Sequence, residues 1–327
     1  MDSLTQATLG AVIGEAVLGR EVGNKGAILG AAIATIPDLD VLLIPFFTEL
    51  EKISIHRGYS HSILFALLGA FVVAYVMSQV QWLRNIHKWK LWFLSFLALF
   101  THILLDAFTT YGTQLSLPFN EHRVSFDSIN IIDPFYTIPL LGGLLISLFR
   151  FQPTARYRPI PNLIGLVISS TYLIFTLANK QQIEHAFEHS LKQHHIAYND
   201  LLTVPVGVGN MRWYGVAKTK EDLFIGQYSQ LYPGRVEFEQ FPINDHLLNS
   251  INHHLVDRMR WFSKGFYTVA EKDGVLRIYN MQCDMQGIRQ YGDYKAPTAF
   301  YFEVDPTLPE GRQLSTGMHQ QQNPSNE

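Results

Sequence analysis

The sequence predicts an α-helical multi-pass membrane domain of about six spans, followed by a small soluble α+β domain with an antiparallel sheet. Of the 327 residues, 47% are hydrophobic and only 16% are charged, and nearly all of the apolar excess lies before Asn179. After Asn179 the composition changes to short strand-like runs that are separated by turns. We therefore predict a membrane domain over 1–179, a soluble domain over 180–310 and a disordered polar tail over 311–327.

Six apolar segments make up the predicted membrane domain. The first two, 3–19 and 26–37, are poor in large side chains. The other four contain no Asp, Glu, Lys or Arg and approach the roughly 20 residues that a membrane helix needs; they are 58–83, 91–105, 134–149 and 159–179.

The first two segments are predicted to form a tightly packed helical hairpin. Gly10 and Gly14 are four residues apart, as are Gly26 and Gly30. This spacing of small residues lets two membrane helices approach closely.

Basic residues in the loops predict the orientation of the chain. The loops "QWLRNIHKWK" (81–90) and "RFQPTARYRP" (150–159) each carry three Lys or Arg residues. By the positive-inside rule, both should be cytoplasmic. Alternation then puts the loops 38–60 and 110–132, and everything after Asn179, on the outer side.

Other features exclude function classes rather than suggest them. No Lys or Arg precedes Arg20, so the amino terminus does not resemble a secretory signal. The single cysteine, Cys283, excludes an intramolecular disulfide. With a net charge of −3 and no long basic run, the chain is not predicted to bind nucleic acid.

The polar residues of the apolar half gather near one predicted membrane face. They belong to the motifs "PDLD", "HRGYSHS", "THILLD" and "IIDP", and Asp2 lies at the start of the first segment. A single His in a membrane helix can simply contact a neighbouring helix, and an Asp before Pro is often a helix cap. As a set, however, these residues predict a site: Asp38, Asp40, His56, His61, His102, Asp106 and Asp133.

Their spacing indicates a divalent metal. His102 and Asp106 are four residues apart, so they share one helix face. Asp38 and Asp40 flank one residue after Pro37, which can aim two carboxylates at one point. Because His and Asp together suit zinc or manganese better than calcium or magnesium, we expect zinc first and manganese as the alternative.

A metal at this position suggests hydrolysis, because it activates water and polarises a carbonyl or phosphoryl oxygen. Arg57 lies between two histidines and could bind a phosphate or carboxylate through its planar fork. Alternatively, Arg57 is a headgroup anchor that reaches the membrane interface. We assign Arg57 and Asp133 as the candidate catalytic residues.

These motifs resemble a known family. Met1-Asp2 with Thr5-Gln6, followed in order by "PDLD", "HRGYSHS", "THILLD" and "IIDP", is similar to the YdjM-like family of membrane-bound metal-dependent hydrolases of the inner membrane. The resemblance covers about residues 1–180 and continues more loosely in "NMRWYGV", "WFSKGFYTV" and "DGVLRIYNM". The family often has His where this chain has Gln6, so Gln6 is at most an outer partner of a metal. The resemblance implies these metal-site positions: Asp38, Asp40, His56, His61, His102 and Asp106.

The soluble domain is predicted from shorter patterns. A helix over 182–195 carries His185 and His189 four residues apart, a pair that is more often solvated than metal-bound. Strands are predicted over 211–219, 222–231, 265–272 and 275–282, with an amphipathic helix over 246–262. Asp273-Gly274 between the last two strands indicates a hairpin.

We therefore expect an inner-membrane hydrolase whose substrate is an ester or phosphoester of a lipid or another amphiphile, with site and soluble domain facing the periplasm or exterior. Two non-enzymatic alternatives stay open. A metal or proton transporter would normally hold its site near the membrane midplane. A scaffold would hold a metal without an open coordination position.

Overall fold

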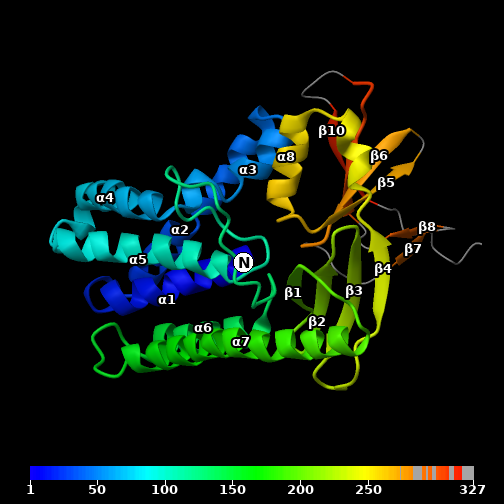
Figure 1. Ribbon diagram of the computed structural model, residues 1–327. Coiled ribbons are helices and arrows are strands. Elements are labelled where there is room, and N and C mark those ends of the chain that lie inside the picture. The colour runs from blue at the N-terminus through cyan, green and yellow to red at the C-terminus, as the bar shows by residue number, and fades with distance from the viewer. Residues whose placement is uncertain (273, 283–288, 292–293, 297–299, 309–312, 319–327) are drawn as a thin grey trace, which may run out of the picture. The chain divides into compact units, whose positions relative to one another are not determined.

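The computed structural model describes residues 1–327 except 273, 283–288, 292–293, 297–299, 309–312 and 319–327 (Figure 1). The chain divides into two units that are described separately. A helical unit contains Met1–Pro45 and Ile55–Asn179, and a sheet unit contains Phe46–Ser54 and Lys180–Glu327.

The helical unit is a bundle of helices around an apolar core. Leu94, Leu99 and Ile103 on α5 are among its most deeply buried side chains. The helices and short 3₁₀ helices are α1 (Ser3–Val22), α2 (Lys25–Ala34), η1 (Pro37–Phe46), η2 (Tyr59–His61), α4 (Ile63–Gln79), η3 (Gln81–Leu83), α5 (Lys88–Ala107), α6 (Pro134–Arg150) and the first part of α7 (Pro159–Gln193).

The predicted hairpin is formed by α1 and α2. A Cβ atom placed on Gly14 would lie 2.1 Å from the carbonyl oxygen of Gly26. One placed on Gly30 would lie 2.0 Å from the carbonyl oxygen of Gly10. Because no side chain fits at these distances, glycine is what allows the two backbones to touch.

The predicted six membrane spans are confirmed only in part. Among the described residues, two helices, α5 and α7, are long and apolar enough to cross a membrane. The number rises to four if each of two bent pairs counts as one span. The bent pairs are α2 with η1, and Glu49–His61 with α4. Helix α6 is apolar but shorter. Six spans are therefore not confirmed, because bends and short helices interrupt the apolar segments.

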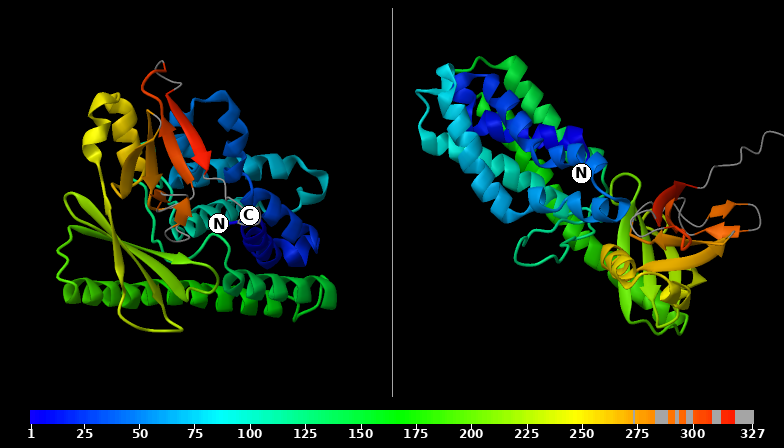
Figure 2. Two further views of the ribbon diagram at one scale, coloured as in Figure 1. Left: turned by 90° about the vertical axis from the view of Figure 1, so that its right-hand side faces the viewer. Right: turned by 90° about the horizontal axis from the view of Figure 1, so that it is seen from above.

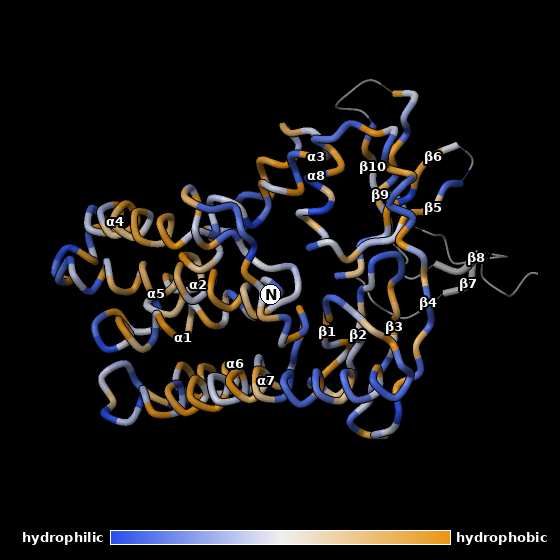
Figure 3. The backbone as a smooth tube through the Cα atoms, in the orientation of Figure 1, coloured by the Kyte–Doolittle hydropathy of each residue, from blue (hydrophilic) through white to orange (hydrophobic). Residues whose placement is uncertain are grey.

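Helix α7 joins two elements that the sequence suggested were separate. The sixth span was expected to end at Asn179 and a second helix to begin near residue 182, but α7 runs unbroken through this region. Figure 3 shows its colour changing from hydrophobic to hydrophilic along its length. The composition changes here, but no Pro or Gly interrupts the helix.

In the described residues of the sheet unit, the strands form two four-stranded antiparallel sheets and a short two-stranded sheet. Figure 2 shows the first sheet lying along the second half of α7. There Phe187 covers Gly215, and it packs with Ile183 and Trp213. The first sheet has the strand order β1 (Asp200–Val206), β2 (Arg212–Lys218), β3 (Asp222–Ser229) and β4 (Phe238–Pro242). The second has the order β10 (Leu314–Met318), β9 (Phe300–Val304), β6 (Val275–Asn280) and β5 (Tyr267–Lys272). The third pairs β7 (Arg289–Tyr291) with β8 (Tyr294–Ala296).

The strand predictions agree with the structure, whereas two others do not. Strands β2, β3, β5 and β6 lie within the predicted runs, and Lys272 pairs with Val275 across a two-residue turn, of which Asp273 lies outside the described residues. The predicted helix over 246–262 is split into η4 (Asp245–Ser250) and α8 (His253–Phe262). Its break falls at Asn252, whose side chain caps α8. The tail over 311–327 was expected to be disordered, but Leu314–Met318 pairs with β9. The rest of the predicted tail, 311–312 and 319–327, lies outside the described residues.

Candidate metal centre

Three elements of the helical unit deliver side chains to one point. His102 and Asp106 lie one turn apart on α5, as their spacing predicted. Asp38 follows Pro37 at the start of η1, and His61 is the last residue of η2, immediately before the capping residue of α4. Each residue offers one ligand atom, and these atoms all lie within 4.8 Å of one another.

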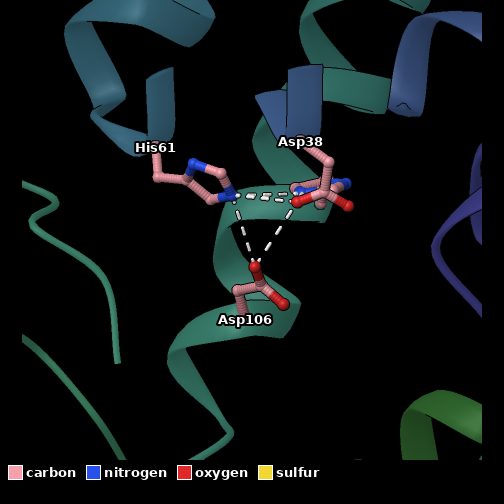
Figure 4. A group of neighbouring side chains, drawn as sticks. Asp38, His61 and Asp106 are labelled. Atoms are coloured by element: carbon pink, nitrogen blue, oxygen red, sulfur yellow. Dashed lines mark hydrogen bonds and ion pairs between the residues drawn. The ribbon is translucent and has the colours of Figure 1, made fainter. Parts of the chain in front are cut away.

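The ring nitrogens and carboxylate oxygens face each other closely (Figure 4). The Nε2 atoms of His61 and His102 are 3.3 Å apart. Asp38 Oδ1 lies 3.5 Å from His61 Nε2 and 3.4 Å from His102 Nε2. Asp106 Oδ2 lies 3.4 Å and 3.8 Å from the same two nitrogens.

These distances fit a small divalent cation. A tetrahedral zinc site with bonds of about 2.0–2.1 Å has ligand-to-ligand edges of about 3.3–3.4 Å. In addition, Asp106 Oδ2 is buried and has no hydrogen-bond partner. A buried carboxylate oxygen in that state is costly unless something else satisfies it. The cluster could therefore hold a metal ion.

Asp38 is the one member of the group of four that is substantially exposed. The side chains of His61, His102 and Asp106 are at most 1% exposed, whereas that of Asp38 is 29% exposed. A group of ligands that is partly exposed can admit a further ligand, as catalytic metal sites do.

Hydrogen bonds behind His61 set the position of its proton. The Ser60 hydroxyl donates to Asp40 Oδ2 at 2.8 Å and lies 2.9 Å from His61 Nδ1. Because that hydroxyl has one proton, its oxygen must accept from Nδ1–H. When His61 is neutral, its lone pair is then on Nε2, which faces the cluster.

Asp40 and His56, two predicted ligands, lie outside the group of four. Asp40 Oδ1 contacts His56 Nδ1 at 3.0 Å, and its Oδ2 accepts from the backbone N–H of Arg57 at 3.0 Å. The Asp40 carboxylate lies 3.4 Å from the Nδ1 side of His61, away from the cluster. In this position it supports a ligand from behind, an arrangement common around metal-binding histidines.

Arg57 is buried beside the cluster. Its Nε lies 3.1 Å from Asp106 Oδ2, and its Nη1 donates to Thr109 Oγ1 at 3.0 Å. The residue adopts a φ of 59°, a backbone conformation rarely seen for a side chain of this size. The backbone at Arg57 is therefore held in a strained conformation next to the candidate site.

Gln6 lies behind the cluster, as an outer partner would, and contacts Asp106 and the backbone of His102. Its Nε2 donates to Asp106 Oδ1 at 3.0 Å and to the carbonyl oxygen of His102 at 3.2 Å. The nitrogen of Met1 also contacts Asp106 Oδ1. Gln6 thus orients one carboxylate while Oδ2 of that carboxylate faces the histidines. Thr109 was not predicted, because nothing in its local sequence marks it. Ser60 was not singled out either, although it lies within the motif "HRGYSHS".

Asp133, predicted to be catalytic, lies outside the group of four. Its Oδ1 caps α6 by accepting from the backbone N–H of Phe135, and its Oδ2 accepts from the Tyr172 hydroxyl at 2.8 Å. These contacts are those of a helix cap. Asp2 similarly caps α1 through Thr5.

The second pair of histidines is not part of the cluster. His185 contacts Glu188 at 3.5 Å and is 79% exposed, and His189 contacts Gln193 at 2.9 Å. The group identified above in the described part of the chain includes neither of them.

Comparison with known proteins places the chain among inner membrane proteins. YfhP of Bacillus subtilis (strain 168) is 32% identical over 157 residues, which is 45% of this chain and 46% of YfhP, so the match spans less than half of that relative. The inner membrane protein YbcI of Escherichia coli (strain K12) is 28% identical over 122 residues, covering 37% of this chain and 69% of YbcI. No solved structure matches. A family model described as YdjM inner membrane protein matches residues 1–183, more than half of the chain and the whole of the candidate metal centre. The chain therefore belongs to the YdjM inner membrane protein family.

Proposed function

We propose that this protein is a membrane-bound, divalent-metal-dependent hydrolase. The observation that supports the proposal is the convergence of four ligand-type atoms from Asp38, His61, His102 and Asp106, of which Asp38 is partly exposed. Sites of this kind, with nitrogen and oxygen ligands and room for a further ligand, are typical of metal-assisted hydrolysis.

The side chains around the cluster have distinct tasks in this proposal. Asp38, His61, His102 and Asp106 would hold zinc or manganese, and the ion would supply a Lewis acid and activate water for attack on an ester. Ser60 and Asp40 hold the proton on His61 Nδ1, which keeps Nε2 available as a ligand.

In this proposal, Arg57 stabilises the charge that develops on the substrate. Its guanidinium group lies 3.1 Å from Asp106 Oδ2, close to where charge would develop on a phosphoryl or carbonyl oxygen. A buried cation there stabilises such charge more strongly than it would in water. The alternative anchoring role fits less well, because Arg57 is only 7% exposed.

The substrate is proposed to be an ester or phosphoester of a lipid or another amphiphile. Family membership and the apolar helices support a location in the inner membrane. A site built at the ends of apolar helices suits a molecule whose tail stays in lipid while its head reaches the metal. The basic loops support a periplasmic or exterior position for the site and the sheet unit.

Metal analysis together with a hydrolysis screen tests the proposal. Purified protein should contain zinc or manganese, and His102→Ala or Asp106→Ala should lower that content. His185→Ala is the matched control and should leave it unchanged, because His185 is exposed and remote in sequence. Full metal content in both cluster variants would contradict the metal site. Metal-loaded protein that cleaves no lipid ester and instead moves the ion across vesicle membranes would favour a transporter.

Arg57→Lys separates chemistry from metal binding. We expect normal folding and metal content but turnover about 10²-fold lower or worse, by analogy with loss of one oxyanion donor, because an ammonium group cannot reproduce the planar fork. The hydrolysis rate on the ester found in the screen decides. A wild-type rate would assign Arg57 to the membrane interface or to packing.

The proposed orientation has its own test. A reporter that is active only in the cytoplasm, fused after Asn179, should be silent. Activity there would reverse the proposed side of both the site and the sheet unit.

A further inference from the structure

The helical unit has a polar pocket that lies far from the candidate metal centre along the helices. Its volume is about 470 Å³, and its walls are the turn between α1 and α2 and the segment that leaves α6. Helix α1 begins beside the metal centre, at Gln6, and reaches this pocket at its other end, at Gly23. The pocket therefore belongs to the opposite ends of the helices.

The pocket is positively charged. Lys25, Arg150 and Arg158 line it, and its described lining contains no acidic residue. The charge of Arg158 is compensated, because its guanidinium group is paired with Glu15. In the described part of the chain, Lys25 and Arg150 form no ion pair with a carboxylate. Two uncompensated positive charges thus face one cavity.

The surface beside the pocket is apolar and aromatic. Phe149, which lines it, is 82% exposed. The Nζ of Lys25 lies 4.8 Å from the centre of the Trp82 ring, and Trp82 is 42% exposed. Basic and tryptophan side chains at the ends of apolar helices are typical of the level of the lipid headgroups.

We propose that this pocket binds the phosphate of an anionic phospholipid headgroup. Lys25 and Arg150 would contact the phosphate from two sides, while the acyl chains would lie along the apolar surface that Phe149 begins. The volume lies within the range of about 300–1,000 Å³ that is usual for small-ligand sites. Basic pockets between membrane helices are suited to such headgroups. The site is separate from the proposed hydrolase chemistry and does not depend on it.

Lipid retention measures the site directly. The full-length protein is reconstituted in bilayer discs of equal parts phosphatidylglycerol and phosphatidylcholine, extracted in mild detergent and analysed by native mass spectrometry. Wild-type protein should retain phosphatidylglycerol preferentially. In the double variant Lys25→Gln/Arg150→Gln, the ratio of retained phosphatidylglycerol to phosphatidylcholine should fall by about 30-fold. Each cation near an anionic lipid contributes a factor of about five or slightly more.

Three controls make the result decisive. Lys25→Arg/Arg150→Lys keeps both charges and should keep the preference. Arg84→Gln removes an exposed charge from another loop, outside the pocket lining, and should change nothing. Thermal unfolding verifies that each variant is folded; should the double variant not fold, Lys25→Gln alone is expected to lose about fivefold.

Other outcomes would overturn the proposal. Equal retention of the two lipids by wild-type protein, or an unchanged preference in the folded double variant, would exclude an anionic lipid site here. Displacement of the retained lipid by millimolar inorganic phosphate would identify a site for free phosphate instead.

Discussion

Two buried charged clusters of the helical unit differ in how completely their polar atoms are hydrogen-bonded. At one end, Arg158 Nε donates to Glu15 Oε1 at 2.6 Å and Nη2 donates to Oε2 at 2.9 Å. Arg158 also reaches Asn24 Oδ1 and the carbonyl oxygen of Phe151. Each nitrogen of this guanidinium group, and both oxygens of Glu15, therefore have a partner.

The cluster at the other end is incomplete. Buried atoms of four residues in and around it have no hydrogen-bond partner: Gln6 Oε1, Arg57 Nε, His102 Nδ1 and Asp106 Oδ2. Two of these, Arg57 Nε and Asp106 Oδ2, lie only 3.1 Å apart, but the geometry between them is not that of a hydrogen bond.

The comparison separates an architectural ion pair from a candidate binding site. A fully paired buried cluster has nothing left with which to bind a ligand, and its role is to hold α1, the α1–α2 turn and the start of α7 together. A cluster with orphaned ligand-type atoms retains unused binding capacity, which a cation would satisfy.

The largest expected effect comes from breaking the complete cluster. Glu15→Gln keeps the shape of the side chain but leaves Arg158, which is 1% exposed, without a counter-charge. Removing one partner of a buried pair costs about 3–5 kcal/mol. We expect this loss in the free energy of unfolding, measured in detergent, with metal content unchanged in the protein that remains folded.

Glu21→Gln is the matched control for Glu15→Gln. It breaks the pair with Lys90, whose side chains are 30% and 48% exposed, and such pairs contribute about 0–1 kcal/mol. If Glu15→Gln lowered the free energy of unfolding no more than Glu21→Gln does, the buried pair would not hold the helices together as argued.

A smaller effect is expected behind the incomplete cluster, at Asp40. Its Oδ2 accepts from Ser60 and from the backbone N–H of Arg57, and an amide keeps one oxygen for these donors but removes the negative charge behind His61. Asp40→Asn should therefore disturb the orientation of His61 and lower metal affinity by about 10- to 100-fold, as loss of an outer partner does. Competition with a chelator measures the affinity.

Asp38→Asn is the comparison for Asp40→Asn. It replaces a carboxylate oxygen that lies 3.4 Å and 3.5 Å from the two facing ring nitrogens, so the loss of affinity should be greater. Equal losses in the two variants would mean that Asp40 contacts the metal directly, as the sequence suggested.

The sequence predicted the parts of the metal centre that depend on local periodicity. His102 and Asp106 share a face because α5 is regular. Asp38 and Asp40 could not be distinguished, since side-chain directions in the 3₁₀ segment after Pro37 are not set by a simple spacing. Arg57 and Asp106 are 49 positions apart in sequence, so their contact depends on how η2 and α5 pack.

The ion pair between Glu15 and Arg158 was not predicted from the sequence, for a related reason. Glu15 and Arg158 are separated by 143 positions, so no local pattern links them. An available signal was Glu15 itself, an ionisable residue inside an apolar segment. In the sheet unit, β10 was missed because "LSTGM" is too polar for a strand-like pattern, and its pairing with β9 is a tertiary contact.

The sheet unit contains a third charged cluster, whose polar atoms are hydrogen-bonded like those of Glu15 and Arg158 but whose side chains are exposed. Arg260 donates to both oxygens of Asp245 at 2.8 Å and 3.0 Å, and the Tyr267 hydroxyl also donates to Asp245. Partial burial alone would raise the pKa of Asp245, but the hydrogen bonds from Tyr267 and Arg260 hold it below its ordinary value. Since the Arg260 and Asp245 side chains are 43% and 49% exposed, solvent weakens the interaction.

Asp245→Asn should therefore have the smallest effect, about 0.2–1 kcal/mol at pH 7. A carboxyl whose pKa is lowered by folding stabilises the protein above the ordinary Asp value of about 3.9, and this contribution disappears as the pH falls through the lowered value. The difference between wild type and variant should accordingly be full at pH 7 and shrink below about pH 3.9. Hydrogen exchange of the segment from η4 through α8 in the full-length protein measures this difference in stability at each pH.

Asp257→Asn is the control, because Asp257 is 74% exposed and lies 3.7 Å from Arg260. This variant should change the stability little at any pH. A loss at Asp245 as large as that at Glu15 would show that completeness of hydrogen bonding, rather than burial, determines the strength of these clusters.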